Sequence, residues 1–374
     1  MAKIRLMDAP EDFTRLGVSP DSVELWEDGR RNQNTAANNW EWWYSDFIFD
    51  DGSTAVVQFF TKAGRTIQMA GDHPAINIRL KLADGTELRD NLTFRPSEAS
   101  FDTRQCNVIM CDNCFIGDLH TYHIKAHSPK GFGVDVTLTS QSKPYRPGTA
   151  YFEIGKPEDF YTWLCVVPTG TATGTMTYQG KTYTVQGTGY HDHQWGSTNF
   201  LTEWNHWVWA RQRFEGGSLL VFDLVGSAKN NYARIPLAFV QDEKGNLLFE
   251  NTKDVQCNVL GIYKDEIHSG KNYPNELQYT FEQDGRRLEY HLKETRILEA
   301  GGLRSAPLPM KLICKTLGIH HSYTRYLAQG DMVLTDGPKK LQRSSELIYE
   351  FMYPGDSFEG HMAKPEHLPE SSRS

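Results

Sequence analysis

The sequence predicts an all-β fold, and three observations support this prediction. Short runs rich in β-branched and aromatic residues recur along the chain, often with apolar and polar residues in alternation. Turn-forming pairs such as Asp51-Gly52 and Asp84-Gly85 separate these runs. Between them the helical period of 3.6 residues is largely missing, which favours sandwiches or barrels over βαβ units. One helix is expected, at residues 308–328.

The length of 374 residues is enough for two domains, each with its own core. One strand-rich block covers residues 36–198 and a second covers residues 199–354, and each is long enough for a lipocalin-sized barrel. We therefore predict two β-barrel or sandwich domains in tandem. Residues 1–35 are expected to form a polar, loosely ordered N-terminal extension, and residues 355–374 a flexible tail.

The composition disfavours several classes of partner. The formal net charge is −8, which argues against binding to nucleic acid or to an anionic membrane surface. No apolar run reaches the 18 or so residues of a membrane span, so stable membrane insertion is not expected. The first residues contain no apolar stretch of signal-peptide length. Six cysteines in so long a chain do not resemble a disulfide framework, and we expect a cytoplasmic protein with reduced thiols.

The most informative segment is residues 187–196, with the sequence GTGYHDHQWG. If it is a strand, Tyr190 and Asp192 lie on one face, and His191 and His193 lie on the other. The next strand is rich in tryptophan, and the same alternation gives a common face to Asn205, Trp207, Trp209 and Arg211.

A carboxyl group beside a phenol and several indoles indicates acid chemistry in an apolar site. Indole rings would desolvate Asp192 and raise its pKa, so that it could hold a proton near neutral pH. The ring faces could also stabilise a carbocation by cation–π interaction, by roughly 0.5–2 kcal/mol per contact. These are the requirements for protonating an unactivated alkene. The alternative interpretation is a structural polar network around Asp192 and His193, with the tryptophans as core.

A second aromatic cluster, residues 40–46 (WEWWYSD), enters the first clear strand. Alternation places Trp42, Tyr44 and Asp46 on one face, and Glu41 and Trp43 on the other. Trp42 and Tyr44 are candidates for the lining of a pocket, although either face could be the core.

The pattern G-x-G-Y-x-D-H-x-W-G, with E-W-W-Y about 145 residues earlier, resembles the carotenoid 1,2-hydratase (hydroxyneurosporene synthase) and AttH-like superfamily. That group includes kievitone hydratases and fungal lipocalin-like Diels–Alderases. The resemblance covers roughly residues 36–353 and implies two lipocalin-like (calycin-type) domains with a ligand pocket within or between them. It implies acid chemistry for Tyr190 and Asp192. The hydratases have a His-x-Trp pair upstream of this motif. The corresponding residues here are Tyr161-Thr162-Trp163, so tyrosine replaces the histidine, and this replacement argues against carotenoid hydration itself.

We therefore predict a cofactor-independent hydratase that acts on an apolar isoprenoid or polyketide alkene. A Diels–Alderase-type pericyclase and a non-catalytic carrier of a hydrophobic metabolite are the alternatives. Asp192 is the expected general acid, with Tyr190 orienting it or relaying the proton. The expected substrate-binding residues are Tyr161, Trp163, Trp195, Trp207, Trp209, Trp42, Tyr44, His193 and Arg211. The expected partner is a hydrophobic small molecule, and the sequence leaves the oligomeric state open.

Two arrangements resemble metal sites. Cys111 and Cys114 have a CxxC spacing with His120 and His123 nearby, which suits zinc. The segment alternates like a hairpin with a turn at Asp112-Asn113, however, and we favour that structural interpretation. His191 and His193 share a strand face and could also hold a metal, but the resemblance implies a metal-free family. No metal or cofactor is therefore predicted.

Overall fold

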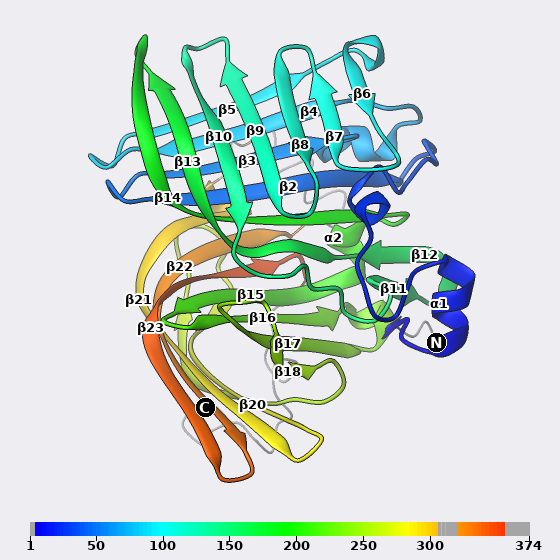
Figure 1. Ribbon diagram of the computed structural model, residues 1–374, viewed down its shortest axis with the longest axis vertical. Coiled ribbons are helices and arrows are strands. Elements are labelled where there is room, and N and C mark those ends of the chain that lie inside the picture. Colours follow the sequence, from blue (N-terminus) through cyan, green and yellow to red (C-terminus); the bar gives the residue numbers. More distant parts are fainter. Residues whose placement is uncertain (1–3, 306–307, 309–310, 312–319, 356–374) are drawn as a thin grey trace. The chain divides into compact units, whose positions relative to one another are not determined.

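The computed structural model of the chain describes residues 4–305, 308, 311 and 320–355, and nearly all regular structure in it is β-strand (Figure 1). The chain divides into two compact units. The N-terminal unit comprises Leu6–Asn199, and the C-terminal unit comprises Met1–Arg5 and Phe200–Ser374. Each unit contains one large curled antiparallel sheet, which confirms the predicted all-β fold of two lipocalin-like domains.

The strands of the N-terminal unit run in antiparallel hairpins. They are β2 (Trp40–Phe49), β3 (Thr54–Phe60), β4 (Ala75–Lys81), β5 (Glu87–Thr93), β6 (Ala99–Phe101), β7 (Asn107–Met110), β8 (Asn113–Gly117), β9 (Thr121–Ser128), β10 (Phe132–Ser140), β11 (Tyr151–Ile154), β12 (Lys156–Thr162), β13 (Leu164–Tyr178) and β14 (Lys181–Gly196). The main path through the sheet is β5-β4-β3-β2-β14-β13-β10-β9-β8-β7-β6, with β12 also pairing β14.

This sheet curls so that its two halves face each other across a common core. Figure 1 shows β6–β10 crossing in front of β2–β5. The rings of Phe59 on β3 and Phe115 on β8 meet edge to face, with their centroids 5.8 Å apart. Alternate residues of both halves are buried between them, because successive side chains of a strand point to opposite faces. The outer face of β8–β10 therefore carries the remaining, more exposed residues.

The expectation that residues 1–35 are loosely ordered is wrong for the described residues 6–35. This segment contains a helix, α1 (Pro10–Leu16), and a 3-10 turn, η1 (Leu25–Asp28). Glu27 and Asp28 are 3% and 0% exposed. Arg146, from the loop before β11, contacts Glu27 at 2.5 Å between Nη1 and Oε2. Polar composition misled the prediction, because these charges are paired inside the unit rather than solvated.

The remaining short elements of this part of the chain are β1 (Ile4–Leu6), which spans the division between the units, and the 3-10 turns η2 (Gly64–Gln68) and η3 (Pro96–Glu98). Within the described residues, the longest helix has seven residues, too few for a helical membrane span.

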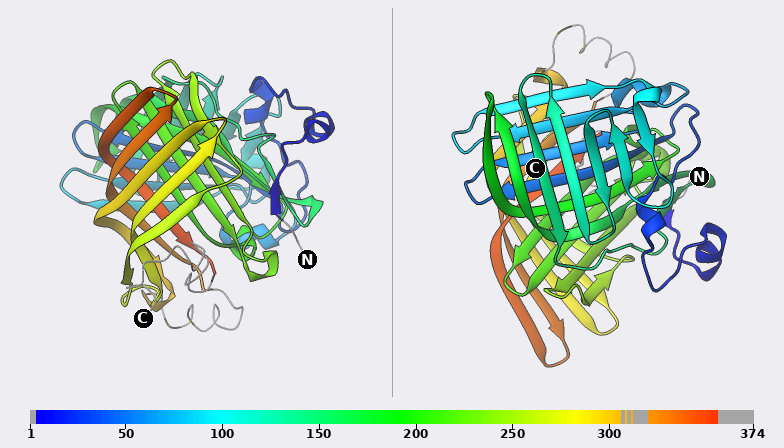
Figure 2. Two further views of the ribbon diagram at one scale, coloured as in Figure 1. Left: turned by 90° about the horizontal axis from the view of Figure 1, so that it is seen from below. Right: turned by 45° about the horizontal axis from the view of Figure 1, so that its top comes forward.

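The C-terminal unit has its own nine-stranded sheet, which Figure 2 shows in two further orientations. It begins with α2 (Phe200–Glu203) and continues through β15 (Trp204–Phe214), β16 (Gly217–Gly226), η4 (Ala228–Asn230), β17 (Arg234–Asp242), β18 (Leu247–Asn251), β19 (Gln256–Lys264), β20 (Asn272–Gln283), β21 (Arg286–Gly302), η5 (Leu303–Ser305), β22 (Ser322–Asp336) and β23 (Lys339–Tyr353). The order is β18-β17-β16-β15-β23-β22-β21-β20-β19. Asn251 at the end of β18 donates to the carbonyl of Glu282 on β20 at 3.0 Å, which draws the curled sheet together.

The helix predicted at residues 308–328 is wrong for residues 322–328, whereas the described residues Leu308 and Lys311 are helical. Residues 322–328 belong to the 15-residue strand β22 and alternate between buried and half-buried positions. Tyr326 and Ala328 are both fully buried on its inner face. Period-two alternation in this segment therefore decided the structure, and most of the rest of the predicted helix lies outside the described residues. The predicted tail also lies outside them beyond residue 355.

Candidate functional site

The motif at residues 187–196 forms the end of β14, between β2 and β13. The register sets Tyr190 opposite Asp46 and Asp192 opposite Tyr44. Packing requires a glycine at position 187 of the motif, because an added Cβ would lie 2.2 Å from the carbonyl oxygen of Ile48 on β2. The glycine thus permits a close approach of the two backbones.

Asp192 lies at the centre of a hydrogen-bonded cluster on one face of β14. Its Oδ2 accepts from the Tyr190 hydroxyl at 2.8 Å and from Nε1 of Trp163 at 3.2 Å. Its Oδ1 accepts from Nε2 of Gln194 at 3.0 Å. Asp192 itself is 4% exposed, and Trp163 and Tyr190 are both fully buried. The carboxyl group is thus removed from water and surrounded by three uncharged donors.

Burial decides the protonation of this group. Desolvation raises the pKa of Asp192 to about 6, against the hydrogen bonds of Gln194, Tyr190 and Trp163 and the charge of His191, which lower it. Burial and the neighbouring carboxylate also raise the pKa of Tyr190 well above its ordinary range, so its phenol keeps its proton. Asp192 is therefore the group of this cluster that exchanges a proton near neutral pH.

A further layer fixes the orientation of these donors. The Tyr161 hydroxyl donates to Oε1 of Gln194 at 2.6 Å, which turns the Gln194 amide nitrogen toward Asp192. The indoles of Trp40 and Trp42 stack with centroids 4.4 Å apart, and Tyr161 lies 6.0 Å from Trp40. Alternation thus builds an aromatic surface on the same side of β2 and β14 as the acid.

His193 lies on the opposite face of β14, in a separate buried network. Its Nε2 is 2.8 Å from Oε1 of Glu41, and its Nδ1 is 3.3 Å from Oδ1 of Asp28. The ring stacks on Trp43 at 4.6 Å between centroids. Trp195 also lies on this side, 4.7 Å from the His193 ring. The structure therefore does not bring His193 or Trp195 to the face that carries Asp192.

In this second network Asp28 and His193 hold each other in the ionised form. Burial alone would lower the pKa of His193, but hydrogen bonds and charges from Asp28 and Glu41 outweigh it and raise that pKa. Burial would likewise raise the pKa of Asp28, but the charges and hydrogen bonds of His191 and His193 hold it well below its usual range. An imidazolium between two carboxylates follows from these contacts.

One group of potential metal ligands adjoins this network. Oxygen, sulfur and nitrogen atoms of Asp28, Cys106 and His191 lie within 4.8 Å of one another, and all three residues are buried. Each already has a protein partner. Asp28 accepts from the Tyr122 hydroxyl at 2.6 Å, His191 lies 2.8 Å from the Tyr44 carbonyl oxygen, and the Cys106 thiol lies 3.6 Å from the carbonyl of Phe115. A metal would have to displace these contacts, and we assign none.

Three predicted site residues belong to the C-terminal unit. Trp207, Trp209 and Arg211 lie on β15, where the Arg211 guanidinium sits 5.6 Å from the centre of the Trp209 ring. Trp209 is 6% exposed. Their participation in a site with Asp192 stays a prediction.

Sequence reasoning missed Gln194 and Asp28. Gln194 could have been found from the alternation that grouped Tyr190 with Asp192, since it is the next residue on that face. Asp28 gave no such signal, because it reaches His191 across 163 residues of sequence and precedes the first clear strand.

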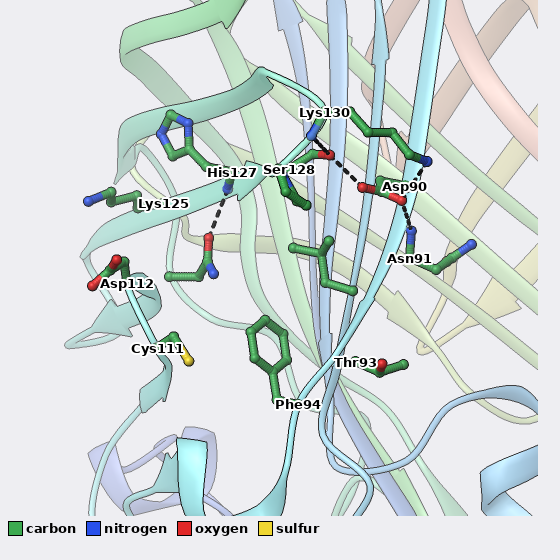
Figure 3. A pocket seen from close by; sticks show the side chains of 13 residues that line it. Asp90, Asn91, Thr93, Phe94, Cys111, Asp112, Lys125, His127, Ser128 and Lys130 are labelled. Carbon is green, nitrogen blue, oxygen red and sulfur yellow. Dashed lines mark hydrogen bonds and ion pairs between the residues drawn. The ribbon is translucent and has the colours of Figure 1, made fainter.

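A groove of about 900 Å³ lies elsewhere in the N-terminal unit, and none of the predicted site residues lines it. Figure 3 shows it between the end of β5 and the β7–β8 and β9–β10 turns. Ser128 and Lys130 both reach Asp90 at its rim, with 2.7 Å between the Lys130 amine and Oδ1. The groove is thus polar at this end, unlike the aromatic surface beside Asp192.

Comparison with known proteins agrees with this architecture. The family model for AttH-like proteins matches residues 84–295, more than half of the chain. The solved structure of an AttH protein from Nitrosomonas europaea is 16% identical with a TM-score of 0.58, over 89% of this chain and 98% of that one. CghA in complex with Sch210972 is 14% identical with a TM-score of 0.62, over 95% and 99%.

Kievitone hydratase from Nectria haematococca is 12% identical with a TM-score of 0.52, over 90% of this chain and 97% of that one. At these identities the likeness concerns the fold. No curated protein matches the sequence significantly.

Proposed function

We propose that this chain, which belongs to the AttH-like family, is a cofactor-independent hydratase of an apolar isoprenoid or polyketide alkene. The observation that carries the proposal is the buried Asp192, whose pKa is raised to about 6 among uncharged donors and aromatic rings. At pH 7 such a group is about one-tenth protonated, whereas a carboxyl with the ordinary value of 3.8 is protonated less than about one-thousandth of the time. Burial thus increases the supply of the acid form roughly a hundredfold.

The proposed reaction proceeds in two steps. Protonated Asp192 transfers its proton to one alkene carbon, and the π electrons form the new C–H bond and leave a carbocation on the other carbon. Water then adds to that carbon, and its surplus proton returns to the Asp192 carboxylate, so the enzyme is regenerated. Shielding from bulk water favours both proton transfer and stabilisation of the cation.

The neighbours of Asp192 suit this role. Trp163 offers only a donor, and the oxygen of Gln194 is already occupied by Tyr161. A proton on Asp192 therefore meets few protein acceptors, and Tyr190 can relay it because a hydroxyl both donates and accepts. In this proposal the indole of Trp163 also stabilises the developing positive charge.

A second candidate is a pericyclase of the Diels–Alderase type. The same donors, Tyr190 and Trp163, could hold a substrate carbonyl, and the fold likeness to CghA in complex with Sch210972 supports considering this chemistry. Acceleration would then come chiefly from holding one substrate conformer. A carrier of a hydrophobic metabolite is the non-catalytic alternative.

The deciding experiment is incubation with acyclic isoprenoid alkenes and polyenes in ¹⁸O-labelled water, followed by mass spectrometry. A product that carries the labelled oxygen supports the hydratase, whereas an isomer of unchanged mass supports the pericyclase. Unchanged alkene that co-elutes with the protein supports the carrier. Asp192→Asn should abolish labelling, and Asp46→Asn, which removes a buried carboxyl from the same face of the neighbouring strand, is the matched control.

A further inference from the structure

A thiol, an imidazole and a carboxylate form a chain of contacts on the outer face of the N-terminal unit. Cys114 on β8 lies with its Sγ 3.6 Å from Nδ1 of His123 on β9. Nε2 of His123 lies 2.7 Å from Oδ1 of Asp135 on β10. The His123 and Asp135 side chains are 49% and 41% exposed. The three groups occupy adjacent strands, and all belong to the face turned away from the core.

The order of these contacts is that of an activated nucleophile. A base within reach of the thiol takes its proton, and a third group fixes the orientation of the base. Partial burial raises the pKa of the Cys114 thiol, so it is protonated at rest and needs such a base to react. Asp135 accepts a hydrogen bond from Nε2 of His123. This favours the tautomer with the proton on Nε2, whose unprotonated Nδ1 can accept the proton of the thiol.

A positive charge also lies next to the thiol. Lys125 on β9 is in register with Cys114 on one side and with Asp135 on the other. Its charge acts to lower the pKa of the Cys114 thiol, against the effects of burial and of the Asp135 charge, which raise it. The ammonium group would therefore stabilise the thiolate once His123 has taken the proton.

We propose that Cys114 is a covalent modification site for soft electrophiles of the α,β-unsaturated carbonyl class, with His123 as the base and Asp135 as the residue that positions it. The thiol proton passes to Nδ1 of His123, and the sulfur electron pair forms a bond to the β-carbon of the electrophile. The C=C π electrons move to the carbonyl as an enolate, which then takes the proton back from the imidazolium. Atoms and charges balance without an oxidant or a reductant.

The groove gives an approaching electrophile space beside this site. Lys125 lines the groove and lies in register with Cys114 (Figure 3). Cys111, in the turn of the same hairpin, also lines it and is more exposed than Cys114. Exposure alone therefore predicts faster modification at Cys111, whereas the contact with His123 predicts faster modification at Cys114.

The test uses N-ethylmaleimide, an α,β-unsaturated carbonyl compound, in limiting amount on the full chain. Peptide mass spectrometry follows the modification of each cysteine over time. A positioned base contributes roughly 10²–10⁴-fold to the rate of a proton transfer. We therefore expect Cys114 to react at least about tenfold faster than Cys111. The buried Cys106 and Cys165 should stay unmodified and so report that the fold is intact.

Variants separate base assistance from simple access. His123→Gln should lower the rate at Cys114 to that of Cys111 or below, and Asp135→Asn should lower it by a smaller factor. Neither should change the rate at Cys111, which is the internal control in the same molecule. Equal rates at the two cysteines in the unaltered chain, or an unchanged Cys114 rate in His123→Gln, would overturn the proposal.

Discussion

Replacing Asp192 with asparagine should make the protein more stable at neutral pH while removing the proposed acid. Asparagine has nearly the same shape as aspartate but carries no charge at any pH of interest. The aspartate, in contrast, is 4% exposed and must be ionised in a place that disfavours its charge whenever the pH lies above about 6. Ionisation of Asp192 therefore destabilises the folded state above this pH, and the variant avoids this loss of stability.

The magnitude follows from the pKa. The folded value of about 6 exceeds the ordinary value of 3.8 by about 2.2, and at 1.36 kcal/mol per pH unit this is about 3 kcal/mol. Because the folded pKa is the higher one, the contribution of Asp192 to stability is fully present below pH 3.8. It is lost as the pH rises toward 6 and stays lost above it.

Asparagine also changes the hydrogen bonds. Its oxygen can still accept from Tyr190 and Trp163, but its amide then faces the Gln194 amide, and about 1 kcal/mol of hydrogen bonding is lost. We therefore expect Asp192→Asn to raise the free energy of unfolding by about 2 kcal/mol at pH 8 and to lower it by about 1 kcal/mol near pH 3.5.

The assay is urea denaturation of the full chain and of the variant at several pH values, followed by tryptophan fluorescence. Asp46→Asn serves as the control for loss of a buried carboxyl on the neighbouring strand. A difference between Asp192→Asn and the unaltered chain that does not change with pH would refute the raised pKa. With a substrate in hand, Asp192→Asn should also lose about 10²–10⁴-fold in rate, and the rate of the unaltered enzyme should fall about tenfold per pH unit above pH 6.

Four further predictions concern the N-terminal unit. Trp163→Phe removes a donor that lowers the pKa of Asp192. The midpoint of the pH-dependent contribution of Asp192 to stability should therefore move above 6. An unmoved midpoint in the same denaturation series would argue against this hydrogen bond. Asp28→Asn leaves His193 with one fewer buried counter-charge and should destabilise the chain by about 3–5 kcal/mol in urea denaturation. In the unaltered chain the stabilising contribution of His193 should weaken as the pH rises through its raised pKa, and thermal unfolding between pH 6 and 10 measures this. Gly187→Ala should cost about 1–3 kcal/mol of unfolding free energy, because its methyl group would meet backbone 2.2 Å away, whereas Gly301→Ala, with nothing within 4 Å, should change it by less than about 0.5 kcal/mol.

The sequence was most informative where the physics is local. Strand alternation alone separates Tyr190 and Asp192 from His191 and His193, because the period of two depends only on neighbouring residues. The sequence also predicts the raised pKa of Asp192 from burial beside indoles, and Trp163 is an indole that contacts it. What alternation cannot supply is the partner across the fold: it places His193 on the face opposite Asp192, but it does not reveal the contacts of His193 with Asp28 and Glu41.

Polar segments were the weakest point of the prediction. The N-terminal residues were expected to be loosely ordered because they are rich in charge, yet Glu27 and Asp28 are buried with Arg146 and His193 as their partners. Composition counts charges but does not show which of them are paired. A buried ion pair looks the same in the sequence as a solvated surface until the partner is known.

A comparison of two buried aspartates of the N-terminal unit shows why the proposed acid is Asp192 and not Asp28. Both side chains are almost fully withdrawn from water, so desolvation favours the neutral form of each. Asp28 faces the imidazoles of His191 and His193, whose charge keeps it ionised. Asp192 receives its three hydrogen bonds from uncharged donors, and these do not offset the loss of water. The difference between the two carboxyl groups therefore arises from the charge of their partners and not from burial, and of these two it leaves Asp192 able to give up and recover a proton near pH 7.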